Sequence, residues 1–278
     1  FAVGIYLSLF TMYLLGQRIW GKQGGILSAF LYAFAPYHAV QIYIRGAVGE
    51  YFAYAFLPLV FLGVVEIFRK KIFKGIIIGS IGFALVILSH NITGLLTVGF
   101  LVLSLLAFFF DKKLLISLFG LILLGLSLSA FFWLPAMAES KYTSVPGLTT
   151  GTNDFHQHFL YLDQLWNSPW GYAGSGPGRS DGMSFRLGQL HLFLFGLVIF
   201  LIFFKYSVIR QVQHNKSYTS ILIILSLGFF VSIFMMLPIS NKIWELVPLL
   251  SFVQYPWRFL VFTAFFLSLI GGSVVNVL

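Results

Sequence analysis

Long apolar segments dominate the sequence and most constrain what it can fold into. A helix that crosses the hydrocarbon core of a bilayer needs about 20 mostly apolar residues. Nine segments approximately meet this requirement: 1–16, 24–43, 51–68, 75–90, 94–110, 114–136, 188–204, 219–238 and 259–278. We therefore predict an all-α fold, a polytopic integral membrane protein with about nine transmembrane helices that form a single domain over 1–278.

Composition supports the membrane class. The chain has 278 residues, of which 59% are hydrophobic and only 9% are charged, and its mean hydropathy is +0.94. These values lie outside the usual range of soluble domains. Cysteine is absent, which excludes disulfides and thiolate chemistry. Because Phe1 and Leu278 both lie inside apolar runs, we expect a fragment of a longer protein, truncated at both ends.

Basic residues fall in loops that alternate along the chain. Cytoplasmic loops of membrane proteins collect Lys and Arg. If the loop that holds Arg18 and Lys22 is cytoplasmic, alternation places three more basic groups on the same side: Arg69, Lys70, Lys71 and Lys74; Lys112 and Lys113; and Lys205, Arg210 and Lys216. Much of the net charge of +9 is then explained by the orientation of the chain in the membrane. We therefore predict a multipass protein of the inner (cell) membrane and no nucleic-acid partner.

The opposite side holds the remaining Lys and Arg residues and most of the acidic ones. Five of the six histidines lie there, so we expect any chemistry to face the outside. The charged residues on this side are Arg45, Glu50, Glu139, Lys141, Asp154, Asp163, Arg179, Asp181, Arg186, Lys242, Glu245 and Arg258.

One long polar segment, about 137–187, is the main outer loop. Its first part, NDFHQHFLYLDQLW, has Phe155, Phe159, Leu162 and Trp166 at helical spacing, which predicts a short helix lying on the membrane surface. Its second part, WGYAGSGPGRSDG, is rich in glycine and is predicted to be irregular. This part lacks the Lys-Ser/Thr pair and the preceding strand of a phosphate-binding loop, so we reject nucleotide binding there.

The segment YIRGAVGEYF contains one cation and one anion between two apolar stretches. Arg45 and Glu50 fall at the outer ends of the second and third predicted helices, and Gly46 and Gly49 allow a tight reversal between them. Ionisable groups at membrane depth usually face the interior, form pairs or line a pathway. A structural ion pair that locks the hairpin, simple snorkelling to water, and a substrate-binding role all remain open.

The segment LSHNITG brings His90 and Asn91 to the outer end of the fourth predicted helix. A histidine here could act as a general base or hydrogen-bond a polar substrate, because its pKa lies near neutrality. The alternative is a helix terminus that satisfies its own backbone groups, with Asn91 as the cap.

The segment SFVQYPWRF precedes the last predicted helix. Tyr255 and Trp257 are typical of the aromatic belt at a membrane interface. Arg258 opposes the charge bias of the outer side, and a guanidinium binds phosphate oxygens in a bidentate manner. We predict that Arg258 binds a phosphate or a lipid headgroup, with a structural ion pair as the alternative.

Two further sets of residues are candidates for chemistry. Glu139, just beyond the sixth predicted helix, is a candidate second carboxylate, although a solvated acid at a loop entrance is the alternative. Asp154, His156 and His158 are possible ligands of a divalent metal if their segment is extended. If the segment is helical, the two histidines point apart, and no Zn-type spacing is present. We therefore predict no cofactor.

Five segments are distinctive in combination: FLYAFAPYHAVQIYIRGAVGEYFAYAFLPLVFLG, LSHNITGLL, FFWLPAMAES, DGMSFRLGQLHL and QYPWRFL. On these segments the chain resembles, over nearly its whole length, the bacterial multipass membrane proteins called "6-pyruvoyl-tetrahydropterin synthase related", a label that implies no pterin chemistry. That family in turn resembles the C-type (GT-C) glycosyltransferases. The family pattern maps onto Pro36, Tyr37, Arg45, Glu50, His90, Asn91, Pro135, Pro256, Trp257 and Arg258.

The resemblance implies transfer of a sugar from a polyprenyl-phosphate donor to an acceptor at the outer membrane face. Arg258 and Arg45 would neutralise the donor phosphate, Glu50 would orient Arg45, and His90 with Asn91 would bind sugar hydroxyls. C-type enzymes usually carry their catalytic acidic residue in the first outer loop, which would precede this segment. The expected partners are a lipid-linked sugar donor and membrane lipid.

Two other classes of function remain open. A transporter or flippase of lipid-linked saccharides could use the same arginines to guide a phosphate headgroup, and a noncatalytic membrane scaffold needs no base. Transporters often have broken helices in matched halves and charges near the midplane. Here the ionisable residues cluster at the outer ends of the predicted helices, which favours a site on the outer face.

Overall fold

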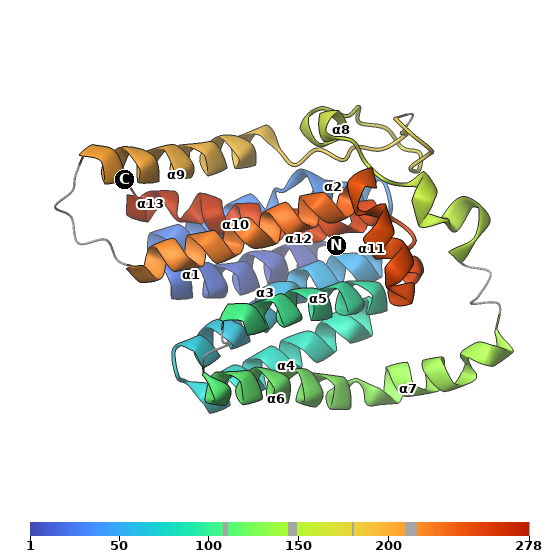
Figure 1. Ribbon diagram of the computed structural model, residues 1–278, viewed down its shortest axis with the longest axis horizontal. Coiled ribbons are helices and arrows are strands. Elements are labelled where there is room, and N and C mark those ends of the chain that lie inside the picture. Colours follow the sequence, from blue (N-terminus) through green and yellow to red (C-terminus); the bar gives the residue numbers. More distant parts are fainter. Residues whose placement is uncertain (108–110, 144–148, 180, 209–215, 278) are drawn as a thin grey trace.

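The structure, a computed structural model, is an all-helical bundle (Figure 1). It describes residues 1–107, 111–143, 149–179, 181–208 and 216–277. No strand occurs within these ranges, which confirms the predicted all-α class. The α-helices are α1 (Ala2–Ala33), α2 (Pro36–Tyr43), α3 (Val48–Phe68), α4 (Ile72–Ser89), α5 (Asn91–Ala107), α6 (Lys112–Leu128), α7 (Ala130–Glu139), α8 (Leu162–Trp166), α9 (Gln189–Val208), α10 (Lys216–Met236), α11 (Asn241–Leu246), α12 (Leu260–Gly272) and α13 (Val274–Val277).

Short 3₁₀-helices connect several of these elements. They are η1 (Ser140–Tyr142), η3 (Gly151–Asn153), η4 (Phe155–Gln157), η5 (Pro238–Ser240), η6 (Pro248–Val253) and η7 (Pro256–Phe259). Most of the long helices run along the long axis of the bundle (Figure 1). We call the end with α2, α8, α11 and η7 the loop end. The opposite end, with Arg18 and the turns before α4 and α6, is the basic end.

Five helices are long and apolar enough to cross a membrane: Ala2–Ala33, Val48–Phe68, Ile72–Ser89, Thr219–Met236 and Pro256–Asn276. A sixth is obtained if α6 and the helix that follows it count as one span. Within the described residues α5 and α9 are apolar but shorter. The chain is therefore a polytopic helical membrane protein, whereas the predicted number of nine spans is not confirmed. Residues 108–110 of the fifth predicted segment lie outside the described ranges.

The first helix folds back on itself at Gly21. This residue has φ 80° and ψ −179°, a conformation that interrupts the helix and that glycine adopts without strain. A Cβ added at Gly16 would lie 3.0 Å from both the Cα of Gly25 and the Cβ of Ser28, so the two limbs pack closely. The predicted separation of 1–16 from the next apolar segment is thus correct, although the interruption is one sharp reversal rather than a loop.

The predicted helix 24–43 is wrong, because the chain breaks between α1 and α2. Pro36 occupies the first turn of α2, where its missing N–H costs nothing, and it cannot continue α1. The break removes the regular i+4 partners of three carbonyl oxygens, although Tyr32 O still accepts from the Ala35 N–H at 3.3 Å. Side chains replace them: His191 Nε2 lies 3.0 Å from Leu31 O, Tyr54 donates to Tyr32 O at 2.8 Å, and His38 Nδ1 lies 2.8 Å from Ala33 O.

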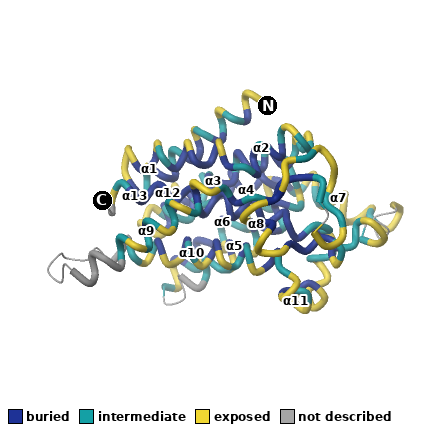
Figure 2. Tube along the Cα trace, turned by 90° about the horizontal axis from the view of Figure 1, so that it is seen from above, coloured by how far each residue is buried: buried dark blue, intermediate teal, exposed yellow. Residues whose placement is uncertain are grey.

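The predicted helix 114–136 is also not continuous. The axis bends by 71° at the junction between α6 and α7. The hydroxyl of Ser129, at the junction, bonds to Gly125 O at 3.0 Å, and its backbone N–H also donates to Gly125 O. No residue of α7 is buried, and this helix runs along the outer edge of the molecule (Figures 1 and 2). The bend therefore carries α7 away from the core.

Two packed groups of helices form the core. In one group α3, α4 and α6 pack against each other, and in the other α12 lies among α1, α9 and α10. Every residue of α12 is buried, and the dark centre of the tube in Figure 2 follows this pattern. A Cβ added at Gly63 of α3 would lie 2.6 Å from Gly75 O of α4 and closer still to the Cα of Gly79. These glycines allow the backbones of α3 and α4 to touch.

The contact between α3 and α4 gives a stability prediction. Gly63→Ala should lower the free energy of unfolding by about 2 kcal/mol, because the added methyl group forces two backbones apart. Gly99→Ala is the matched control: Gly99 also lies inside a helix, but nothing lies within 4 Å of its added Cβ. This control should stabilise by up to about 1 kcal/mol through helix propensity. Detergent unfolding of both variants checks the prediction, and an equal response would contradict it.

Candidate functional site: a buried charged cluster at the loop end

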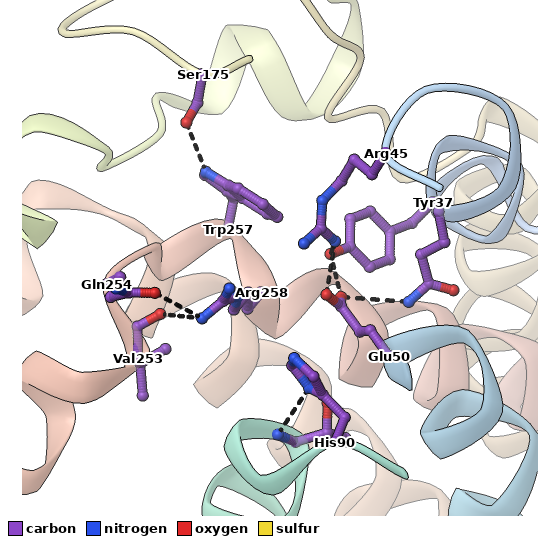
Figure 3. Close-up of polar contacts among 11 residues, drawn as sticks. Tyr37, Arg45, Glu50, His90, Ser175, Val253, Gln254, Trp257 and Arg258 are labelled. Atoms are coloured by element: carbon purple, nitrogen blue, oxygen red, sulfur yellow. Dashed lines mark hydrogen bonds and ion pairs between the residues drawn. The ribbon is translucent and has the colours of Figure 1, made fainter. Parts of the chain in front are cut away.

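Four of the five residues predicted to bind substrate converge at the loop end (Figure 3). Arg45 lies in the link between α2 and α3, Glu50 in the first turn of α3, His90 between α4 and α5, and Arg258 in η7. We call these four residues the loop-end cluster. Residues from distant parts of the sequence thus lie together at the loop end (Figure 3), and their binding of a substrate stays a prediction.

Glu50 is fully engaged by its neighbours. Its Oε2 accepts from Arg45 Nη1 at 2.6 Å, and its Oε1 accepts from the Tyr37 hydroxyl at 2.5 Å and from Gln41 Nε2 at 3.2 Å. Glu50 is only 2% exposed. The ion pair between Arg45 and Glu50, one of the alternatives left open by the sequence, is therefore observed. A carboxylate with both oxygens occupied in this way positions Arg45 and is not free to act as a base.

Gly49 brings Glu50 and His90 together. A Cβ added at Gly49 would lie 2.6 Å from the carbonyl oxygen of Ser89 and 3.9 Å from the His90 ring. The start of α3 therefore packs directly on the end of α4, an approach that a side chain at this position would prevent.

The ring of His90, not the side chain of Asn91, caps α5. The Thr93 N–H donates to His90 Nδ1 at 3.2 Å, and the Thr93 hydroxyl lies 2.8 Å from the same nitrogen. Because Nδ1 accepts a backbone N–H, the ring is neutral and carries its proton on Nε2, which faces the cluster (Figure 3). Asn91 is exposed and accepts only from the N–H of Ile92, so its predicted capping role is wrong.

Arg258 is buried, and its hydrogen-bond acceptors among the described residues are neutral. Its Nη1 donates to Val253 O at 2.7 Å and approaches Gln254 Oε1 at 3.4 Å, and its guanidinium lies 5.0 Å from the centre of the Tyr255 ring. The residue is 9% exposed, and its buried Nε has no hydrogen-bond partner among the described residues. Gln254 has φ 64°, an uncommon conformation for a residue other than glycine that turns the chain at this point. The alternative for Arg258, a structural ion pair, is not observed within the described ranges, and its binding of a phosphate or a headgroup stays a prediction.

Trp257 packs against the loop-end cluster and does not lie in an aromatic belt at the membrane interface. It is 3% exposed, its ring stacks on Tyr255, and the Arg45 guanidinium lies 4.6 Å from its ring centre. Its Nε1 donates to the Ser175 hydroxyl at 3.0 Å. The belt interpretation of Trp257 is therefore wrong. An interfacial tryptophan and a buried one look alike in sequence, and only the fold separates them.

The glycine-rich part of the long loop covers the cluster. Ser175 bonds to Trp257 and also to His158 Nδ1 at 2.9 Å, and the Tyr255 hydroxyl donates to Asn153 Oδ1 at 2.7 Å. Asp181 fixes the loop by accepting from the backbone N–H of Gly176 at 3.1 Å. The prediction that this segment is irregular is confirmed for its described residues.

The predicted surface helix in the first part of this loop is wrong. The chain forms η4, then a short stretch without regular secondary structure, then α8. Phe155 and Phe159 are each 7% exposed and pack on Trp244, whereas Leu162 and Trp166 are exposed. The first two aromatic residues contact α11 instead of a membrane surface, and this tertiary contact outweighs the helical spacing.

The candidate metal residues do not form a metal site. His156 Nδ1 lies 2.6 Å from Asp154 Oδ1, and its Nε2 lies 3.5 Å from Glu245 Oε1. His158 instead approaches Thr152 O and Ser175. No group of three His, Cys, Asp or Glu side chains suited to a metal occurs among the described residues. Partial burial would lower the pKa of His156, but Asp154 and Glu245 outweigh it and raise that pKa, which favours an ion pair.

Glu139 lies far from the cluster. It ends the exposed helix α7 on the outer edge of the molecule (Figure 1). Within the described ranges it makes no recorded ion pair or side-chain hydrogen bond. The bend before α7 carries this residue along the edge of the molecule, and its role as a second carboxylate of the site stays a prediction.

The loop-end cluster has one surplus positive charge. Arg45 and Arg258 contribute two, Glu50 contributes one negative charge, and the His90 ring is neutral. An uncompensated charge shielded from water is costly unless it is paired. The arrangement is therefore suited to an anion that approaches Arg258, with the N–H of His90 as a second donor.

Comparisons with known proteins give one relative. An uncharacterized protein of Lactococcus lactis subsp. cremoris (strain MG1363) is 29% identical over 248 residues. The match covers 86% of this chain and 38% of that protein, so the chain spans little more than a third of the relative's length. No protein-family model matches the chain, and no solved structure matches it.

The buried pair gives a second stability prediction. Glu50→Gln should lower the free energy of unfolding by about 3 kcal/mol, because it leaves the Arg45 charge without its partner in a dry environment. Glu245→Gln is the control, since the Glu245 side chain is 52% exposed and its loss should change stability by less than about 0.5 kcal/mol. Unfolding midpoints in detergent compare the two variants. If both unfold like the wild type, the pair does not stabilise the fold.

Proposed function

We propose that this chain acts as a GT-C-like glycosyltransferase that moves a sugar from a polyprenyl-phosphate donor to an acceptor, with the donor phosphate bound at the loop-end cluster. The observation that supports this most is Arg258: a buried guanidinium whose described partners are neutral and whose Nε has none. A phosphate oxygen is the ligand that such a group binds most strongly. The resemblance of the APY, RGA-x-GE, SHN and PWRF segments points to the same chemistry.

The two arginines have different roles in this proposal. Arg258 contacts the phosphate directly through its Nε and its second Nη. Arg45, held by Glu50 and by the face of Trp257, adds a fixed positive charge beside it. When the bond between the anomeric carbon and the phosphate oxygen breaks, negative charge grows on the leaving phosphate. Cations that are already fixed in a dry site stabilise that charge without reorganisation.

His90 supplies a hydrogen-bond donor for the sugar. Its neutral ring presents Nε2–H toward the cluster, so it donates to a hydroxyl oxygen or to the bridging oxygen of the donor. Asn91 has no place in this proposal, since its exposed side chain bonds to the adjacent backbone.

The transfer step also needs a base. The acceptor hydroxyl oxygen forms a bond to the anomeric carbon, the polyprenyl phosphate departs, and the hydroxyl proton passes to a carboxylate. Glu50 does not fit this role, because both of its oxygens are occupied, and Glu139 is remote from the cluster. We therefore assign donor binding and leaving-group stabilisation, but not the base, to residues 1–278.

The proposed orientation follows from charge. The basic end carries Arg18, Arg69, Lys70, Lys71 and Lys74, and cytoplasmic segments of inner-membrane proteins collect such residues. We place this end in the cytoplasm and the loop-end cluster at the outer face.

Donor turnover tests the proposal. The protein is incubated in detergent with a panel of radiolabelled polyprenyl-phosphate sugars, and release of the sugar is followed. Arg258→Gln should reduce turnover by at least about 100-fold, as expected when a donor to the developing charge is lost. Arg179→Gln is the control, because this arginine lies on the covering loop, 3.5 Å from Asp163, with its side chain 65% exposed. It should retain wild-type turnover.

Two results would contradict the proposal. Equal turnover by Arg258→Gln and the wild type would remove the phosphate site from this cluster. Failure of folded wild-type protein to retain any of the radiolabelled donors would remove the donor site altogether. Matching unfolding midpoints for the two arginine variants exclude simple misfolding as the cause of lost turnover.

A further inference from the structure

A second site candidate is an apolar cavity in the half of the bundle near the basic end. It lies between α5 on one side and α10 and α12 on the other, with α1 and α3 behind, and its volume is about 650 Å³. Typical ligand pockets have volumes of about 300–1,000 Å³. Its walls are almost entirely apolar and include Leu15, Phe61, Phe100, Leu225, Phe265 and Leu269. Such a cavity accepts a hydrocarbon chain and not a polar substrate.

The cavity is about as deep as one leaflet of a bilayer. On α3 its lining runs from Phe61 to Arg69, and eight residues of helix correspond to about 12 Å. Half of the hydrocarbon core of a bilayer is about 15 Å. On α1 the lining residues lie within 15–19, and on α5 they lie within 100–104. These stretches belong to the half of the bundle near the basic end, so the cavity occupies that half. A chain that enters from the leaflet at the basic end can therefore fill it.

Two arginines line the cavity where it reaches the basic end. Arg18 is fixed by the buried Glu66, with Nε 2.8 Å from Oε1 and Nη2 3.0 Å from Oε2. Arg69 donates from Nη1 to the carbonyl oxygen of Arg18 at 3.1 Å, and Lys74 lies 3.4 Å from Glu66. Arg18 and Lys74 both pair with Glu66, and Arg69 lies beside Arg18, so these four side chains together carry two surplus positive charges.

We propose that this cavity binds one acyl chain of an anionic glycerophospholipid from the leaflet at the basic end, with its phosphate at Arg18 and Arg69. The apolar walls select a hydrocarbon chain, the depth matches a single leaflet, and the surplus charge selects an anionic headgroup. The cations lie at the opposite end of the bundle from Arg258. The site is therefore separate from the loop-end cluster and does not rest on the proposed glycosyl transfer.

Retention of lipid by the purified protein tests the proposal. The protein in detergent is mixed with phosphatidylglycerol or with phosphatidylcholine of the same acyl chains, and the lipids retained are counted by native mass spectrometry. The wild type should retain one phosphatidylglycerol and prefer it at least about fivefold over phosphatidylcholine. Equal retention of the two lipids would overturn the headgroup assignment.

A matched pair of serine variants tests the chain pocket. Ser104 lines the cavity and its hydroxyl bonds to Phe100 O at 2.9 Å, whereas Ser127, exposed on α6, bonds to Leu123 O at the same distance. Ser104→Phe places a ring at the cavity wall and should abolish retention, while Ser127→Phe should retain phosphatidylglycerol as the wild type does. Equal retention by the two variants would overturn the proposed cavity site.

A second pair of variants tests the headgroup contact without disturbing Glu66. Arg69→Gln leaves the ion pair between Arg18 and Glu66 in place and should weaken the preference for phosphatidylglycerol about fivefold. Lys113→Gln, a loss of charge at the same end but away from the cavity, should not change it. An unchanged preference in Arg69→Gln, or an equal loss in Lys113→Gln, would show general attraction to a basic surface in place of a site.

Discussion

The structure depends on one constraint, which is that backbone polar groups in hydrocarbon need partners within the protein. The chain breaks its helix after Ala33, and the carbonyl oxygens freed there are satisfied by His38, Tyr54 and His191. Because these three side chains bond to the carbonyl oxygens, the helix can end there and the chain can turn into α2. That turn places Tyr37, on α2, beside Glu50 and so makes the charged cluster geometrically possible.

Charge is scarce in this chain, and the structure concentrates much of it in two buried arrangements. At the loop end Glu50 holds Arg45, and Arg258 remains without an anionic partner among the described residues. At the basic end Glu66 holds Arg18, with further cations beside it. In each arrangement one buried carboxylate fixes an arginine, and positive charge remains in excess. This common pattern is the reason that we propose a phosphate ligand at each end, although the loop end is covered by polypeptide and the basic end adjoins an apolar cavity.

Part of the site could be predicted from the sequence. Arg45, Glu50, His90 and Arg258 were identified because ionisable groups beside apolar helices are unusual, and the structure brings all four together. Tyr37 and Gln41 were not assigned as partners of Glu50, since a tyrosine and a glutamine in an apolar run give no distinct signal. Asn91 was included because it is polar and adjacent to His90. At the beginning of a helix, however, the side chains of adjacent residues point in different directions.

Errors about the fold had tertiary causes. The apolar run 24–43 contains Pro36, which was a visible signal for a break, but the side chains that make the break tolerable come from α3 and from α9. The bend before α7 has no proline at its junction, and local sequence gave no indication of it. Phe155 and Phe159 have the spacing of a helix, yet Trp244, far along the chain, offers a better contact.

The sequence by itself determined the class of the protein, because hydrophobic segments of sufficient length and a low charge content leave a helical membrane bundle as the stable fold. It also determined which ionisable residues lie near the ends of those segments. Only the tertiary structure decided which of them meet, which carboxylates are occupied and which guanidinium retains an unpartnered nitrogen. The physical reason is that pairing and burial depend on helix breaks and close glycine contacts between segments distant in sequence, whereas hydropathy is a local property.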